Sequence, residues 1–116
     1  MQINKLSILE GARAATGLTV IIDVFRAFST ACYVYDNGAE IIYPVGTVEE
    51  AFEMKEKNHD FILIGERHEK KCEGFDFGNS PSHILNENFN GKSVILTTSS
   101  GTKGIVNALN ADQIIT

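Results

Sequence analysis

The chain has 116 residues, 43% of them hydrophobic and 22% charged, which is enough to bury one core and is ordinary for a soluble globular domain. Fifteen acidic and ten basic residues give a formal net charge of −5, which excludes the basic surface of a nucleic-acid-binding protein. No apolar run reaches the length of a membrane span, and the first residues lack the core of a signal peptide. We therefore expect a single cytoplasmic domain over residues 1–116 that binds neither nucleic acid nor membrane.

The first part of the chain predicts a strand that leads into a helix. Residues 1–8 alternate weakly between polar and apolar side chains and predict a short strand, and residues 10–17, with two glycines, predict a connector. Leu18–Thr30 begins with a continuous apolar, β-branched run, which is typical of a strand buried on both faces. From Ala27 onward the apolar side chains recur at helical spacing, so the strand is expected to open into a helix at its carboxyl end.

Two more strands follow in the middle of the chain. Residues 40–45 predict a second strand, and Thr47 with Glu50 three positions later forms a capping box at the start of a helix. Residues 60–64 predict a third strand. The next connection, residues 65–79, is longer than most in compact domains, and its aromatic and glycine residues favour an ordered, functional loop.

The last part of the chain repeats the same order of elements. Ser80 followed by Pro81 predicts the start of a short helix. Residues 93–96 predict a fourth strand, which ends in the small and hydroxylated residues 97–102 and a helix, and residues 113–116 begin a fifth strand. Strands that alternate with helices predict an α/β fold, a three-layer α/β/α arrangement with a mainly parallel sheet. The apolar ending in mid-strand predicts a homo-oligomer or the amino-terminal half of a longer protein.

Charged residues follow the first and third predicted strands, where ligands of open α/β sheets bind. Asp23 and Arg26 lie at the end of the first strand, and Glu66 and Arg67 follow the third. Together with Asp76 in the long loop, Asp23 and Glu66 would provide hard oxygen ligands for Mg²⁺. The two arginines could hold a phosphate or sulfonate. The simpler alternative is that Asp23 caps the helix and pairs with Arg26.

Residues 97–102 are a second candidate site. Backbone N–H groups and hydroxyls at a strand-to-helix turn can face an anion at the start of the helix. Ordinary N-capping by Ser99 or Ser100 explains the same residue types. The turn lacks the residue order of a Walker A loop, and no dinucleotide-binding glycine pattern occurs in the chain.

Four stretches resemble those of the 2-phosphosulfolactate phosphatases of coenzyme M biosynthesis and their bacterial relatives. They are residues 22–27 with Ser29-Thr30, Gly65-Glu66-Arg67, residues 74–81, and Thr97-Thr98 with Gly101-Thr102. Their order and spacing match as well as their residue types, and the resemblance covers nearly the whole chain. It implies an α/β/α fold and the Mg²⁺-dependent hydrolysis of a small acidic phosphate ester.

The resemblance also implies a site assembled from these stretches. Asp23, Arg26 and Asp76 would be catalytic, and Asp23, Glu66 and Asp76 would hold Mg²⁺. The phosphate ester would be bound by Ser29, Thr30, Arg67, Thr98, Ser99, Ser100, Gly101 and Thr102.

The chain departs from the family pattern in two ways. Phe28 stands where members usually have a small or hydroxylated residue, and Ser100 stands where they usually have an asparagine. Members are also considerably longer, so the resemblance covers only their amino-terminal half. Phe25 occupies the position of the second aspartate in the haloacid-dehalogenase pattern, which favours attack by a metal-activated water over attack by Asp23. Two alternatives to an enzyme stay open: an anion-binding domain without turnover, and a structural fragment whose sheet pairs with a partner.

Overall fold

A computed structural model describes all 116 residues as a mixed α/β fold. The elements in chain order are α1 (Ile8–Ala14), β1 (Gly17–Val20), α2 (Ala27–Asp36), β2 (Ile41–Pro44), α3 (Val48–Lys57), β3 (Ile62–Arg67), β4 (Lys70–Lys71), α4 (Pro81–Ile84), β5 (Ser93–Thr97), α5 (Gly101–Asn107) and β6 (Ala111–Ile115). Three of the four strand pairings are parallel and only β3–β4 is antiparallel, so the predicted α/β class with mainly parallel strands is confirmed. None of the helices is long and apolar enough to cross a bilayer.

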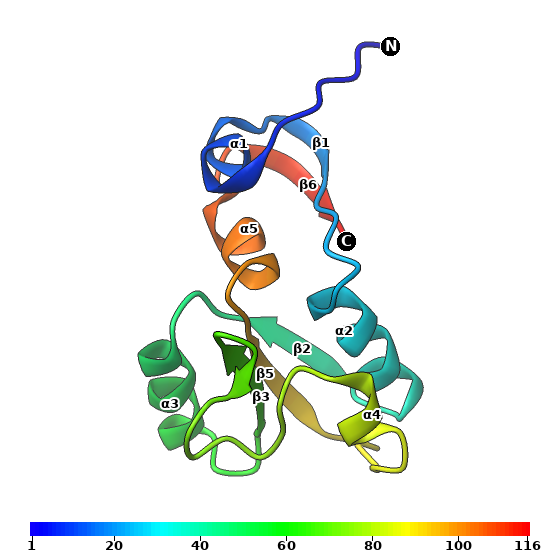
Figure 1. The fold of residues 1–116 in the computed structure, drawn as a ribbon, viewed down its shortest axis with the longest axis vertical. Helices are drawn as coiled ribbons and strands as arrows, with labels where there is room; N and C mark the ends of the chain where they lie inside the picture. The colour runs from blue at the N-terminus through cyan, green and yellow to red at the C-terminus, as the bar shows by residue number, and fades with distance from the viewer.

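The strands form two sheets. The larger sheet has the order β2-β5-β3-β4, and β1 pairs with β6 in a separate two-stranded sheet. Figure 1 shows this pair above the larger sheet, with α5 rising from the end of β5 towards β6. The β1 ladder ends where the Ile21 N–H donates to the Ile115 carbonyl, and the chain then leaves the strand for α2.

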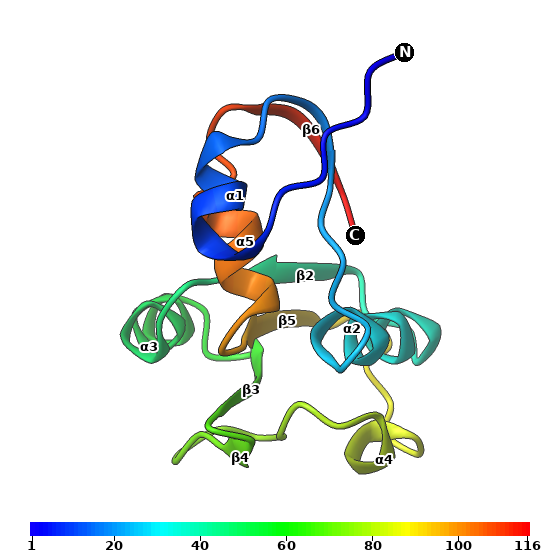
Figure 2. The ribbon, with the colours of Figure 1, turned by 45° about the horizontal axis from the view of Figure 1, so that its top comes forward.

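Helices cover both faces of the larger sheet. Figure 2 shows α3 on one side and α2 with α4 on the other. Side chains alternate between the faces of a strand, so neighbouring residues of β3 enter different cores. Ile64 joins the cluster on the α2–α4 side and Leu63 the cluster on the α3 side. Both residues are buried. The continuous apolar sequence of β3 therefore places hydrophobic side chains on both faces of the sheet, and helices cover each face.

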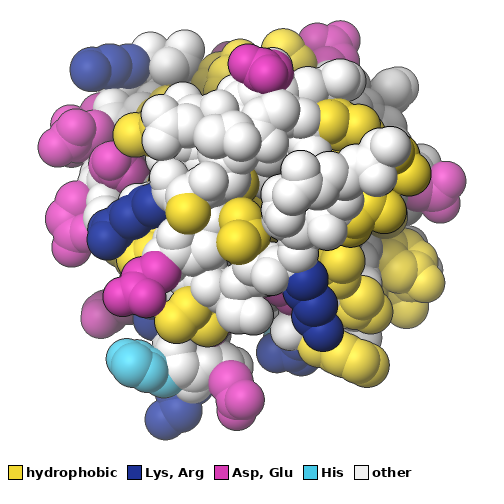
Figure 3. Space-filling model, turned by 90° about the horizontal axis from the view of Figure 1, so that it is seen from above, with side chains coloured by type: hydrophobic (Ala, Val, Ile, Leu, Met, Phe, Trp, Pro, Cys, Tyr) yellow, Lys and Arg dark blue, Asp and Glu magenta, His cyan; other side chains and the backbone are white.

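The expectation that the first strand is buried on both faces is wrong. Leu18 and Val20 of β1 are 64% and 58% exposed, and Ile22 and Val24 beyond its end are 80% and 60% exposed. The β1–β6 pair has no second helical layer over these alternate side chains. In Figure 3 hydrophobic side chains gather on the right, the side on which β1 and the segment leading to α2 lie in Figure 1.

The amino-terminal expectations are also corrected. Residues 1–7 form no strand, and the expected connector contains α1. Alanine, leucine, glutamate and arginine favour a helix, and this preference outweighs the glycine at position 11. Gly11 is buried, and a Cβ built there would lie 2.9 Å from the Leu6 Cβ, so this glycine permits close packing.

The long loop is ordered as predicted, and it pairs with the sheet. It contains β4, and its later part runs beside β3, where the Gly65 N–H donates to the Phe77 carbonyl at 3.1 Å and the Phe77 N–H donates to the Leu63 carbonyl at 3.1 Å. The loop therefore extends the larger sheet beyond β3.

Candidate active site

The carboxyl ends of β3 and β5 meet at the turn that precedes α5. Glu66 lies at the end of β3 and is 8% exposed. Its carboxylate accepts hydrogen bonds from the Ser99 N–H at 2.6 Å, the Ser99 hydroxyl at 2.9 Å and the Glu69 N–H at 3.1 Å. Glu66 therefore ties the turn between β5 and α5 to the end of β3.

The Glu66 carboxyl stays ionised despite its burial. Burial by itself raises the pKa of a carboxyl group, because it disfavours the charged form. The hydrogen bonds from Ser99 and Glu69 and the nearby Arg67 charge act in the opposite direction and hold the pKa of Glu66 below its ordinary value. The site thus contains a fixed negative charge at neutral pH.

Asp23 reaches the same turn from the other side. A Cβ built on Gly101 would lie 2.7 Å from the Asp23 Oδ2 and 2.6 Å from the Ala27 Cβ, so only glycine allows this approach. The N-cap of α2 is Arg26, whose side chain makes no capping hydrogen bond. Asp23 is therefore not the cap of the helix, and its carboxylate lies against the backbone at the start of α5.

Arg67 links three strand ends. Its guanidinium donates to the Glu66 carbonyl at 2.7 Å, to the Gly46 carbonyl at 3.1 Å and to the Thr97 hydroxyl at 2.8 Å. These bonds use three of the five N–H donors of an arginine, so two remain for a ligand. The approach of β3 to β5 depends on Gly65, whose added Cβ would lie 2.4 Å from the Thr97 carbonyl oxygen.

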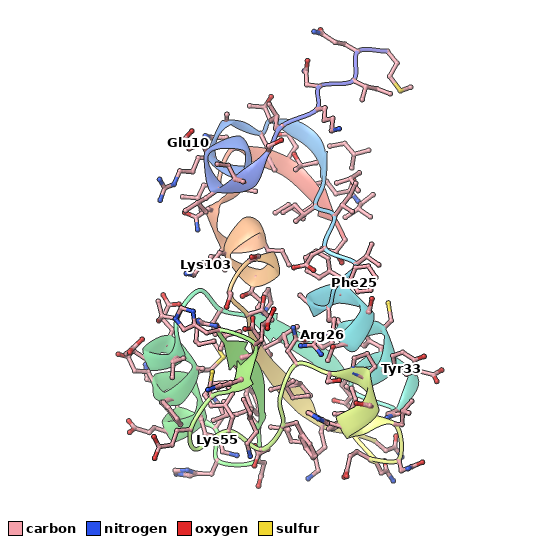
Figure 4. The ribbon with its side chains drawn as sticks, viewed as in Figure 1. Glu10, Phe25, Arg26, Tyr33, Lys55 and Lys103 are labelled. Atoms are coloured by element: carbon pink, nitrogen blue, oxygen red, sulfur yellow. The ribbon has the colours of Figure 1, made fainter.

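Arg26 lies on the α2 side of the turn. The peptide bond between Phe25 and Arg26 is cis, and the Phe25 side chain is exposed. In the view of Figure 4 the Arg26 side chain lies between the first turn of α2 and the sheet, whereas Lys103 lies on the opposite, α3-facing side of α5.

The threonines of the turn bond to each other. Thr98 and Thr102 are 2% and 0% exposed. The Thr98 N–H donates to the Thr102 Oγ1 at 2.8 Å, and the Thr102 N–H donates to the Thr98 Oγ1 at 3.2 Å. Their hydroxyls shape the turn from inside and do not face solvent, in contrast to the predicted contact with a phosphate ester. The exposed Ser100 is the N-cap of α5 but makes no side-chain capping bond.

The predicted ligands on α2 also have local roles. The Ser29 hydroxyl donates to the Val24 carbonyl at 2.5 Å, which closes the turn before the helix. Thr30 is fully buried, and its hydroxyl has no hydrogen-bond partner. The Thr30 hydroxyl is thus enclosed in the protein, whereas the bond of Ser29 lies at the surface.

Asp76 is not brought to the turn. It is exposed, and its carboxylate accepts a hydrogen bond from the Leu63 N–H at 2.8 Å, near the start of β3. Glu66 lies three residues further along the same strand, about 10 Å away at the usual rise of a strand. No group of three His, Cys, Asp or Glu side chains is arranged to hold a metal ion. The predicted triple carboxylate site of Asp23, Glu66 and Asp76 is therefore not assembled in this structure, although the first two flank one turn.

A sequence model of the family described as 2-phosphosulpholactate phosphatase matches residues 6–116. The chain belongs to the 2-phosphosulfolactate phosphatase family. Proteins named "probable 2-phosphosulfolactate phosphatase" are similar to it: one from Caldanaerobacter subterraneus is 42% identical over 83% of this chain and 41% of that protein. One from Clostridium beijerinckii is 38% identical over 89% of this chain and 44% of that protein. One from Bacillus subtilis is 38% identical over 87% of this chain and 44% of that protein.

The chain spans less than half the length of these 2-phosphosulfolactate phosphatase relatives. The resemblance to this family is thus confirmed. The match to part of the longer relatives does not by itself show that this chain has their activity.

Sequence reasoning missed the basic side chains around Arg67 in this member of the phosphatase family. Lys70, Lys71 and Lys103 line two hollows in which Arg67 also takes part. The lysine pair was visible in the charged part of the long loop, and Lys103 follows the turn directly, but only the fold brings them to one face. Cys72 lines the larger hollow, and burial raises the pKa of its thiol, only partly offset by the Arg67 charge, so this thiol is not an activated nucleophile.

Proposed function

We propose that this chain binds the phosphoryl group of a small acidic phosphate ester at the Ser99–Gly101 turn and takes part in its hydrolysis. The observation that carries this proposal is the convergence of Asp23 and Glu66 on one turn at the carboxyl ends of parallel strands. Ligands of α/β sheets bind in this position. The relatives named as probable 2-phosphosulfolactate phosphatases support a phosphate ester of that kind as the substrate.

The phosphoryl oxygens would be neutralised by arginines. Arg67 has two free N–H donors and is held in place by its bonds to Gly46 and Thr97, so little side-chain freedom is lost when it binds. Arg26 would approach from the α2 side. The exposed Ser100 provides a backbone N–H and a hydroxyl that are not used in capping. Fixed donors of this kind stabilise the charge of the transition state.

A Mg²⁺ ion fits part of the predicted ligand set. Asp23 and Glu66 are two carboxylates at one turn, which is the number that Mg²⁺ usually takes together with water and phosphate oxygens. We therefore assign these two residues, without Asp76, as the side chains that would hold it. When bound, Mg²⁺ would supply Lewis-acid stabilisation and an activated water. The residues of the chain would orient the ester, and the Ser99 bonds would keep Glu66 ionised and in position.

The test is hydrolysis of 2-phosphosulfolactate and of p-nitrophenyl phosphate by the chain, with Mg²⁺ and with a chelator. We expect turnover that depends on Mg²⁺ and falls by at least about a hundredfold in Asp23→Asn, because the variant removes a charge at the reacting centre. Asp76→Asn is the matched control and should keep Mg²⁺ binding, measured by calorimetry on the folded variant. Loss of Mg²⁺ binding in Asp76→Asn but not in Asp23→Asn would contradict this assignment.

An anion-binding domain without turnover is the second candidate. It is favoured by the position of Asp76, which leaves the site with fewer carboxylates than the sequence predicted. Phosphate binding at the turn with no turnover under any metal condition would select this candidate over the enzyme.

A further inference from the structure

Two adjoining hollows lie on the α3 side of the Ser99–Gly101 turn. The larger has a volume of about 530 Å³ and the smaller about 260 Å³, and Val48 and Arg67 line both. We call the two together the basic groove. Its other lining residues are Phe52, Lys70, Lys71, Cys72 and Glu73 in the larger hollow, and Gly46, Thr47, Glu49 and Lys103 in the smaller one.

The basic groove is positive in an acidic protein. Its lining contains Lys70, Lys71, Lys103 and Arg67 against only two carboxylates, whereas the whole chain has a formal net charge of −5. A hollow whose lining carries an excess of one sign of charge attracts ligands of the opposite sign even when the net charge of the protein repels them. The groove is therefore suited to a small anion.

Arg67 connects the basic groove with the turn. Its side chain lines both hollows while it bonds to Thr97, the last residue of β5 before the turn. Lys103 lines the smaller hollow and stands two positions after Gly101. Figure 4 shows Lys103 on the side of α5 that faces α3, away from Arg26. A ligand with one anionic group at the turn can thus place a second group beside Lys103.

We infer that the basic groove binds the acidic group of the substrate that is not transferred, a carboxylate or a sulfonate, through Lys103 and Arg67. This inference rests on the proposed function, which places the phosphoryl group at the turn. Lys103 and Arg67 donate charge-assisted hydrogen bonds to the oxyanion, and Val48 lies against the carbon skeleton. Lys103 is a specificity-determining residue, and it selects phosphate esters that carry a second acid.

The test uses sulfolactate, which carries both acidic groups but no phosphate, so that binding is separated from hydrolysis. Its dissociation constant is measured by amide chemical-shift titration. We expect Lys103→Gln to weaken binding about tenfold, because one charge-assisted contact is lost. Glu49→Gln should tighten binding, since Glu49 lines the same hollow with the opposite charge. Lactate and isethionate, which carry only one of the two groups each, identify which oxyanion Lys103 holds.

Lys92→Gln is the matched control. Lys92 is exposed and directly precedes β5, at the end of that strand opposite Thr97, so the same change in charge there should leave sulfolactate binding unchanged. Equal binding by the Lys92 and Lys103 variants, or no sulfolactate binding by the wild type, would overturn the inference. Hydrolysis of p-nitrophenyl phosphate, which lacks a second acid, tests the proposed function separately. A chain that binds sulfolactate through Lys103 but hydrolyses no ester supports the groove and contradicts the activity.

Discussion

The Glu66 side chain joins two segments that are distant in sequence. Its carboxylate accepts two hydrogen bonds from Ser99 and one from Glu69. Such a buried carboxylate, which accepts three hydrogen bonds, stabilises the fold only while it is ionised.

Glu66 should make the stability of the chain depend on pH. Its pKa in the folded state lies below the ordinary value of 4.5, so its stabilisation is complete above that value and is lost as the pH falls through the folded-state pKa. We expect Glu66→Gln to lower the free energy of unfolding by about 1–3 kcal/mol near neutral pH, because buried donors lose their charged acceptor. The difference from wild type should shrink as the pH falls below 4.5. Urea unfolding at several pH values measures it, with the exposed Glu53→Gln as control; parallel curves for wild type and Glu66→Gln would contradict this role.

Gly101 should tolerate no larger side chain. The Cβ of Gly101→Ala would press on the backbone-fixed Ala27 Cβ and on Asp23, and we expect a loss of about 1–3 kcal/mol in unfolding free energy. Gly104→Ala in the same helix is the control, because its Cβ would meet a methyl group of the Ile21 side chain at 3.1 Å. Thermal unfolding of both variants gives the comparison. Equal stability of the two would show that α2 and α5 are not packed as described.

The residue types of the site could be predicted from the sequence, but their geometry could not. Asp23 and Glu66 both lie at the turn before α5, although β1 and β3 belong to separate sheets and not to the single sheet that the sequence predicted. Asp76 lies elsewhere, because the long loop first returns to the start of β3 and then runs parallel to that strand, which leaves Asp76 beside Leu63. Nothing in the local sequence states how far such a loop returns.

At the scale of elements, the connection between β5 and α5 is closed by the reciprocal bonds of Thr98 and Thr102. Small hydroxylated residues at a strand-to-helix turn indicated an anion site or a cap, and the structure shows that the buried pair does the capping. The two exposed serines between them are left on the outer side of the turn. The sequence did not distinguish inner from outer hydroxyls, because that depends on packing against α2 and β3.

Thr102→Val should therefore destabilise the chain more than Ser100→Ala. Valine keeps the shape of Thr102 but leaves the buried Thr98 N–H without its acceptor, which costs about 1–3 kcal/mol. Ser100 makes no side-chain capping bond, so its removal should change the unfolding free energy by less than about 0.5 kcal/mol. Chemical unfolding of the two variants tests this order. A larger effect of Ser100→Ala would mean that the Ser100 side chain makes a capping hydrogen bond to α5.

At the scale of the whole molecule, one side is apolar and uncovered. The alternate residues Leu18, Val20, Ile22 and Val24 are all more than half exposed, and Phe25 is 93% exposed. The sequence run was interpreted as a strand between two layers, and one layer is absent in this chain. Contiguous apolar surface of this kind marks an interaction site or causes association.

The chain alone should self-associate through this strip. We expect an apparent mass in light scattering that rises with concentration, and Val20→Lys with Ile22→Lys should lower it, because charged side chains prevent apolar contact. Asn86→Lys, at an exposed position after α4, adds a charge elsewhere and should have no effect. A concentration-independent monomer mass for the wild type would contradict the prediction.

The separate β1–β6 sheet pairs a strand near the start of the chain with the last strand. It has only two strands, and the helices next to them, α1 and α5, are joined by the Arg13–Asn107 hydrogen bond, whose partners are 94 positions apart. Pairing two strands that are so far apart in sequence costs conformational entropy, and only one ladder of hydrogen bonds offsets this cost. The β1–β6 ladder should therefore open more readily than the buried β5. Amide hydrogen exchange should then be faster at Ile21 than at Ile95. Because Asp23 follows β1 directly, each opening would withdraw its carboxylate from Gly101, and an anion bound at the turn should slow exchange in a strand that it does not touch.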